Sequence, residues 1–121
     1  MNTKVQNPNG KKYDLEERTA KLAEVVLVFL KTIKETTINR PIISQLARAI
    51  TSIGANYCEA DGAESKKDFK HKIAICKKES KETKFWLRML SKVNSETTEK
   101  CRKFWQEAQE LTLIFSSILK K

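Results

Sequence analysis

The chain has 121 residues, a length that suits one domain and leaves no room for a second. Hydrophobic residues make up 40% of it and charged residues 32%, which is apolar enough for a packed core and excludes wholesale disorder. The formal net charge of +9 favours association with polyanions. Lysines that only solvate the surface would give the same charge, so composition leaves both explanations open.

Residues 1–12 are polar and are predicted to form a flexible tail ahead of one helical domain over residues 13–121. Asp14, followed three residues later by Glu17, has the pattern of a capping box and predicts the start of a first helix. Apolar residues at helical spacing carry this helix to about Glu35. They are Leu15, Leu22, Val26, Phe29 and Ile33.

A second helix is predicted between Pro41, which suits a first helical turn, and the break at residues 61–64. Gly54 lies inside it and costs about 1 kcal/mol relative to alanine. We interpret this glycine as a point where another helix comes close. The apolar stripe steps by three and four residues through Ile43, Leu46, Ile50, Ile53 and Tyr57.

A third helix is predicted after a cap at Ser65, with Asp68 at the box position, and a fourth after a cap at Ser95. The third helix has a seam of the coiled-coil type: Phe69, Ile73, Cys76, Ser80, Thr83, Leu87 and Leu90. The stripe of the fourth consists of Cys101, Phe104, Ala108, Leu111, Phe115 and Ile118. With no alternating strand pattern and with short connections, the fold class predicted is all-α, an antiparallel up-down-up-down four-helix bundle.

Three cysteines, Cys58, Cys76 and Cys101, are widely separated and form no C-x-x-C pair. This pattern argues against a disulfide framework and against a zinc site. Each lies on or near an apolar stripe, so we expect buried, reduced thiols in a cytoplasmic protein. The longest apolar run, residues 25–30, is too short to span a bilayer, and no membrane association is expected.

One line of the third helix carries only positive charge, and we call it the basic strip: Lys70, Lys77, Lys81, Lys84 and Arg88. At 100° per residue these five positions fall within about 40° of Lys70, and no acidic residue shares the line. Its length of about 27 Å matches a run of phosphates in sign and spacing. Plain solvation of the helix is the alternative. Aromatic residues are not interleaved with the strip, Phe85 being nearest, so base-specific readout is not expected.

Glu79 and Glu82 lie in an arc of the third helix that also holds Trp86 and Met89. A carboxylate that is buried there needs a partner, whereas one at an exposed helix edge does not. Candidate partners, on the same chain or on a second copy, lie on the second helix: Gln45 and Arg48.

The residues that chemistry would need are missing from the sequence. There is one histidine, His71, and there is neither a phosphate-binding loop nor a Ser-His-Asp or Cys-His arrangement. The E-x-x-H pairs of di-iron bundles are absent too. We therefore predict no enzyme, no catalytic residue, no cofactor and no metal site.

Residues 48–90 contain the pieces TSIGANYCEA, SKKDF and KESKETKFWLRML. This segment resembles the large-subunit rRNA intervening-sequence protein family. The resemblance implies a left-handed antiparallel four-helix bundle that assembles as a ring-like homopentamer, and it implies no activity. The chain is also similar, in fold pattern and charge, to accessory proteins of diversity-generating retroelements, which bind a reverse transcriptase and nucleic acid.

The recurrent Asn and Glu of that family fall on Asn56 and Glu59 of this sequence. The resemblance implies that the Asn56 amide bonds across a helix interface and that Glu59 lies at an oligomer contact. Lys77 and Lys78 stand where many members have small residues, which enlarges the basic strip. The predicted oligomer or packing interface comprises Gln45, Arg48, Asn56, Glu59, Glu79, Glu82, Trp86 and Met89.

Two functions follow from these patterns. The first is a non-enzymatic, homopentameric adaptor that binds RNA or DNA through the basic strip. The alternative is a protein-interaction scaffold, accessory to a reverse transcriptase or another protein partner, that makes no direct contact with nucleic acid. In that alternative the line through Trp86 and Met89 is the partner surface, and the lysines only keep the protein in solution.

Overall fold

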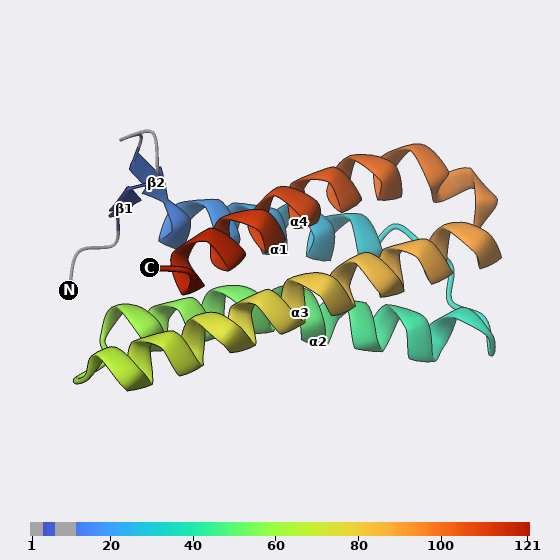
Figure 1. Cartoon of the computed structure of the whole chain (residues 1–121). Helices are drawn as coiled ribbons and strands as arrows, with labels where there is room; N and C mark the ends of the chain where they lie inside the picture. Colours follow the sequence, from blue (N-terminus) through green and yellow to red (C-terminus); the bar gives the residue numbers. More distant parts are fainter. Residues whose placement is uncertain (1–3, 7–11) are drawn as a thin grey trace.

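The computed structural model describes residues 4–6 and 12–121, and its helices form a bundle. The four helices are α1 (Leu15–Leu30), α2 (Asn39–Asp61), α3 (Lys66–Val93) and α4 (Thr98–Leu119), with a short 3-10 helix, η1 (Ser95–Thr97), before the last. Figure 1 shows that the chain reverses direction between successive helices. The predicted all-α four-helix bundle is therefore confirmed, while its left-handed sense stays a prediction.

Two of the predicted helix starts have the expected caps. The Asp14 carboxylate accepts a hydrogen bond of 3.2 Å from the Glu17 N–H at the start of α1. The Ser65 hydroxyl accepts one of 3.0 Å from the Asp68 N–H at the start of α3. Each bond satisfies a backbone donor that the first helical turn would otherwise leave without a partner.

The predicted cap at Ser95 is wrong. Ser95 lies inside η1, and the side chain at the N-cap position of α4, Thr97, makes no capping bond. The Thr97 hydroxyl instead donates to the Asn94 carbonyl at 2.6 Å. The chain thus turns one residue earlier than the sequence pattern suggests, and the 3-10 turn leads into α4.

The first helix also ends earlier than predicted, at Leu30 and not near Glu35. At that end the Phe29 carbonyl accepts hydrogen bonds from the N–H of Thr32 at 3.0 Å and from its hydroxyl at 2.6 Å, and a capping box of the next helix follows. The Thr36 N–H donates to the Asn39 side-chain oxygen at 2.7 Å, and the Asn39 N–H donates to the Thr36 hydroxyl at 3.0 Å. These reciprocal bonds commit the backbone around Thr36 to the start of α2, so α1 cannot continue through it.

Asn39 joins two loops at one end of the bundle. Its side chain is buried, and its amide nitrogen donates to the Lys34 carbonyl and to the Asn94 side-chain oxygen, each at 3.0 Å. Asn94 stands between α3 and η1. One buried amide therefore ties the α1–α2 connection to the α3–α4 connection.

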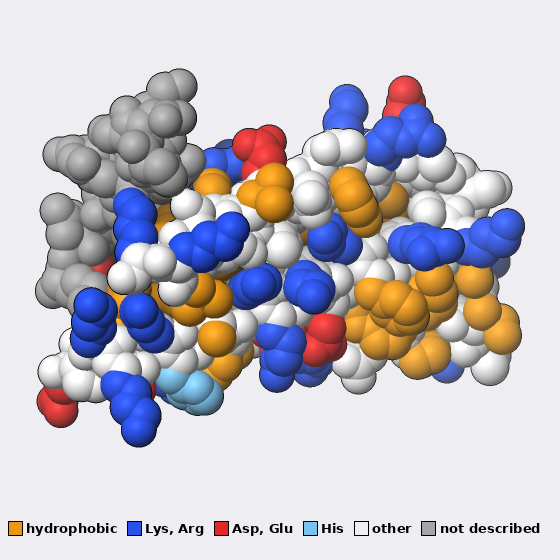
Figure 2. Space-filling view, viewed as in Figure 1, with side chains coloured by type: hydrophobic (Ala, Val, Ile, Leu, Met, Phe, Trp, Pro, Cys, Tyr) orange, Lys and Arg blue, Asp and Glu red, His pale blue; other side chains and the backbone are white. Residues whose placement is uncertain are grey.

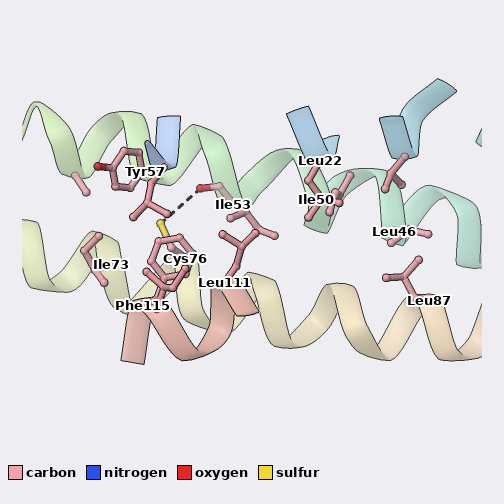
Figure 3. Close-up of a cluster of buried hydrophobic side chains, with 14 of the residues drawn as sticks. Leu22, Leu46, Ile50, Ile53, Tyr57, Ile73, Cys76, Leu87, Leu111 and Phe115 are labelled. Atoms are coloured by element: carbon pink, nitrogen blue, oxygen red, sulfur yellow. Dashed lines mark hydrogen bonds between the residues drawn. The ribbon is translucent and has the colours of Figure 1, made fainter. Parts of the chain in front are cut away.

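The core lies between the seams of the helices, and α3 is its centre. This helix packs extensively on α2 and on α4, whereas α1 packs mainly on α2 and touches α4 much less. Figure 3 shows side chains from α2, α3 and α4 meeting around Cys76, whose thiol donates to the Ile53 carbonyl at 3.5 Å. The predicted seam residues of α3 from Ile73 to Leu90 are buried, and Phe69 is partly buried.

The cysteine prediction is right for two residues and wrong for one. All three thiols are free, and Cys76 and Cys101 are buried. Burial raises the pKa of Cys76 to about 12 and raises that of Cys101 as well. Cys58 is exposed, because the buried stripe of α2 runs through its neighbour Tyr57 and leaves the next position about 100° round the helix.

A short hairpin precedes the bundle and was not expected. Strands β1 (Lys4–Gln6) and β2 (Lys12–Asp14) pair antiparallel, with Val5 opposite Tyr13. Three-residue strands are too short for an alternating pattern to be recognised in a sequence. The other residues of the predicted tail, 1–3 and 7–11, lie outside the described residues.

Gly54 marks a close approach of two helices, as predicted. A Cβ atom placed on it would lie 3.2 Å from the hydroxyl oxygen of Thr19 on α1. That oxygen also donates to the Leu15 carbonyl at 2.6 Å, which holds the Thr19 side chain in place. The glycine therefore allows α1 to pack closely on α2.

We expect Gly54→Leu to lower the free energy of unfolding by about 1–3 kcal/mol, because the added atoms meet Thr19. Gly54→Ala has two opposing effects: the higher helix propensity of alanine adds up to about 1 kcal/mol of stability, and the new methyl group crowds Thr19. The gain should be larger in a Thr19→Ala background than in the native chain. Urea unfolding of the four combinations measures this difference, and equal effects in both backgrounds would show that the contact does not explain the glycine.

Candidate nucleic-acid interface

The basic strip lies on the outside of α3. The packing that buries the seam of α3 turns Lys81 and Arg88 fully outward and leaves Lys70, Lys77 and Lys84 half-buried. Figure 2 shows Lys and Arg side chains gathered along the face over α3 and α4, with a hydrophobic patch toward one end. The structure thus places the five predicted residues along one open surface.

The strip has no acidic partners among the described residues. None of its five members takes part in the ion pairs found there. Lys72, which lies on α3 but outside the strip, does form an ion pair: its ammonium lies 2.7 Å from the carboxylate of Glu59 on α2. The charge of the strip is therefore not neutralised by the neighbouring helices.

Among the residues that the structure describes, Lys84 is the member of the strip with hydrogen-bond and ring contacts to α4. Its ammonium donates to the side-chain oxygen of Gln109 and lies 5.2 Å from the centre of the Trp105 ring. Both contacts are to uncharged groups, and an ammonium at this distance from an indole is attracted to its face. Lys84 is therefore held in one place by uncharged groups.

The structure places one further cation, Arg102, on the surface that carries the basic strip. A cleft of about 340 Å³ between α3 and α4 is lined by Arg88 and also by Arg102 of α4, with Trp105 beside them. Arg102 thus extends the basic strip across the cleft onto the next helix. Its exposed position on α4 could be read from the sequence, but the side of the bundle that it faces could not.

A second hollow lies on the other side of the strip. It has a volume of about 460 Å³ and is lined by Ala74, Lys77, Lys78, Lys81, Glu82 and Phe85. Phe85 is 51% exposed, and its ring packs edge-to-face with Trp86, with the ring centres 4.9 Å apart. An aromatic ring therefore does lie beside the lysines, at the position that the sequence marked as nearest.

Glu79 and Glu82 find their partner on the same chain. Arg48 of α2 donates from Nη1 to both oxygens of Glu79, at 3.1 and 3.2 Å, and from Nη2 to Glu82 at 2.6 Å. Its Nε donates to Gln45 at 2.9 Å. Of the two alternatives left open by the sequence, the structure shows the one within a single chain.

The other residues of the predicted interface are placed as follows. The Asn56 amide donates to Ser52 of its own helix, to the carbonyl at 2.9 Å and to the hydroxyl at 3.0 Å, and not across a helix interface as expected. Glu59 pairs with Lys72. Trp86 and Met89 are half-buried, and the indole N–H of Trp86 is enclosed with no hydrogen-bond partner in the described part of the chain. Their role in an oligomer stays a prediction.

Comparison with known proteins identifies the family. The model of the 23S rRNA-intervening sequence proteins matches residues 11–117. The chain belongs to this family. A crystal structure from Bacteroides thetaiotaomicron, described as a protein of unknown function from the S23 ribosomal protein family, shares its fold with a TM-score of 0.79 and 30% identity. The match covers 88% of this chain and 96% of that one. No match was found among curated proteins.

The described residues contain neither a membrane-spanning helix nor a candidate metal site. Within them, none of the helices has the length and apolar character that a membrane crossing requires. Likewise, no three His, Cys, Asp or Glu side chains in the described ranges are grouped so that they could hold a metal ion.

We expect Arg48→Met to lower the free energy of unfolding by about 1–3 kcal/mol, because it leaves the buried Glu79 carboxylate without a cation. Adding Glu79→Gln should restore part of the loss. Arg40→Met is the matched control, since Arg40 pairs with Glu35 where both side chains are mostly exposed, and it should cost less than about 1 kcal/mol. Urea unfolding followed by circular dichroism gives the values, and equal losses at Arg48 and Arg40 would contradict this account.

Proposed function

We propose that this protein is a non-enzymatic, cytoplasmic adaptor that binds RNA or DNA through the basic strip of α3. The observation that carries the proposal is the absence of acidic partners for the five cations of the strip within the described residues. A surface shaped only for solubility usually mixes signs through pairs three or four residues apart. An unmixed line of about 27 Å instead suits successive phosphates.

The contacts of the strip also define the kind of binding expected. Lysine and arginine side chains on phosphates carry no base information, so binding should tolerate any sequence. Counterion release makes such binding steeply dependent on salt, by about 0.7–0.9 logarithmic units per phosphate contacted. Five contacts would therefore give a slope of about −4 in a plot of log affinity against log salt.

We expect replacement of Lys70, Lys77, Lys81, Lys84 and Arg88 by Gln to abolish binding to a fluorescent RNA or DNA at moderate salt. The matched control replaces five lysines outside the strip, on α1, the α1–α2 connection and α4: Lys21, Lys31, Lys34, Lys100 and Lys103. Both variants lower the formal charge from +9 to +4, so they differ only in where the charge is lost. The control should keep most of the affinity and of the salt slope. Equal losses in the two variants would assign binding to net charge and not to the strip.

We further infer that the adaptor acts as a homo-oligomer, and the family resemblance favours five copies. The polar residues of the predicted interface are already paired within one chain, which leaves the apolar face of α1 as the stronger candidate for a subunit contact. Val25 and Val28 are exposed there, about 60° apart round the helix, and Val28 is 65% exposed. Several copies would present several strips to one nucleic acid and would strengthen weak contacts by avidity.

Light scattering should give the mass of five chains of 13.9 kDa each. We expect Val28→Glu to shift that mass toward one chain, because it places a charge in an apolar contact. Met89→Glu, on the surface of α3 that the sequence favoured, is the matched variant and should leave the mass unchanged. The reverse pattern would place the subunit contact on α3, and a native mass of one chain would remove the oligomer from the proposal.

One observation favours the alternative function, a protein-interaction scaffold accessory to a reverse transcriptase or another partner. Apolar side chains are exposed at Ile38, directly before α2, at Val93, the last residue of α3, and at Phe85 within α3. A pull-down that recovers a protein partner after nuclease treatment, together with unchanged affinity for nucleic acid in the strip variant, would support the scaffold over the adaptor.

A further inference from the structure

The hollow beside the basic strip combines an open aromatic ring with positive charge. Phe85 follows Lys81 by four residues, so the two side chains lie on the same side of α3. Lys77 and Lys78 line the same hollow. With 51% of its surface exposed, the Phe85 ring is not part of the core. The hollow therefore offers an apolar surface with three ammonium groups around it.

The Phe85 ring packs against the ring of Trp86. Trp86 is half-buried, and its ring meets that of Phe85 at an angle of 80° with the centres 4.9 Å apart. This edge-to-face geometry is a favourable one for two aromatic rings. Phe85 is thus oriented before any ligand arrives, which lowers the entropy that binding would cost.

One acid lines the hollow, and it is already paired. The carboxylate of Glu82 accepts a hydrogen bond of 2.6 Å from Nη2 of Arg48. That guanidinium also pairs with Glu79, so the two carboxylates and Arg48 together keep one negative charge, which the three lysines of the hollow outnumber. The three lysines of the hollow have no such partner among the described residues, so the rim is positive toward an incoming group.

We propose that Phe85 is a stacking platform for one unpaired base of a single-stranded nucleic acid whose neighbouring phosphates contact Lys77, Lys78 and Lys81. The proposal rests on the proposed function and adds to it a preference for single strands. A base of any kind has a flat face that can stack on the ring, so the platform is compatible with binding that tolerates any sequence. A duplex keeps its bases stacked on each other and has none to offer to Phe85.

A protein partner or a second copy of the chain is the other occupant that an exposed ring could have. The composition of the hollow favours the nucleic acid. Protein interfaces are depleted of lysine at their centres, whereas here three lysines surround the one ring. Phosphates with a base between them supply the negative charge that the lysines attract and the flat face that can stack on the Phe85 ring.

The test compares the native protein and Phe85→Ala on three probes of equal length: a single-stranded oligothymidylate, an abasic strand with the same phosphates, and a duplex. Loss of one stacked base should weaken binding to the oligothymidylate by about five- to hundredfold. Binding of Phe85→Ala to the abasic strand and to the duplex should equal that of the native protein. Phe85→Trp keeps a ring and should retain the affinity for the oligothymidylate.

Val93→Ala is the matched control, since it removes an exposed apolar side chain of α3 that does not line the hollow. It should bind all three probes as the native protein does. An unchanged affinity of Phe85→Ala for the oligothymidylate, or an equal loss on the abasic strand, overturns the stacking platform and leaves phosphate binding by the strip intact. A lower mass of Phe85→Ala in light scattering assigns the ring to a protein interface and also overturns it. If the native protein binds none of the probes, both this proposal and the proposed function fall.

Discussion

The burial of one seam of α3 fixes the rotation of that helix about its own axis, and the surface chemistry of the molecule depends on this rotation. Ile73, Cys76, Leu87 and Leu90 are almost completely enclosed between α2 and α4. Each large apolar side chain so buried contributes about 1.5–3 kcal/mol. A turn of the helix by one residue step, about 100°, would lose these contributions and carry the basic strip toward the core. The outward direction of the lysines is thus a consequence of the packing of the apolar seam.

The bundle is packed less tightly between α1 and α4 than around α3, so the proposed subunit contact and the basic strip lie on different parts of its surface. Where α1 faces α4 the contacts are few, and the two helices are held by Arg18, which bonds to Glu107 at 2.6 and 2.8 Å and to Glu110 at 3.0 Å. Beside this clamp lies a groove of about 840 Å³ with Leu22, Val25 and Phe104 in its lining. The basic strip stands instead along α3, which packs closely on both of its neighbours. A subunit contact on α1 would therefore leave the strip open, and the two proposed roles need not compete for one surface.

Local patterns in the sequence predicted what depends on neighbouring residues, and they failed where distant residues decide. The caps at Asp14 and Ser65, the seam of α3 and the close approach at Gly54 follow from spacing and residue type within one helix. The end of α1 at Leu30 does not, and neither does the capping box between Thr36 and Asn39 that begins the next helix. The exposure of Cys58 and the place of Arg102 beside Arg88 depend on which sides of α2 and α4 face inward. For the candidate site, the strip could be predicted from spacing along α3, whereas the hollow beside Phe85 and the ring contact between Phe85 and Trp86 were seen only in the structure.

The weakness of each contact in the strip shapes what the protein can do with a nucleic acid. An exposed lysine on one phosphate gains little, since both groups remain in water of high dielectric constant and the side chain loses conformational freedom on binding. Useful affinity then needs many such contacts at once, from the length of α3, from Arg102 across the cleft and from further copies of the chain. Stacking on Phe85 differs from these contacts in kind, because it is not screened by salt. At any given salt concentration, a strand with unpaired bases would therefore bind more tightly than a duplex that makes the same phosphate contacts, and the ring would convert a general attraction to phosphate into a preference for single strands.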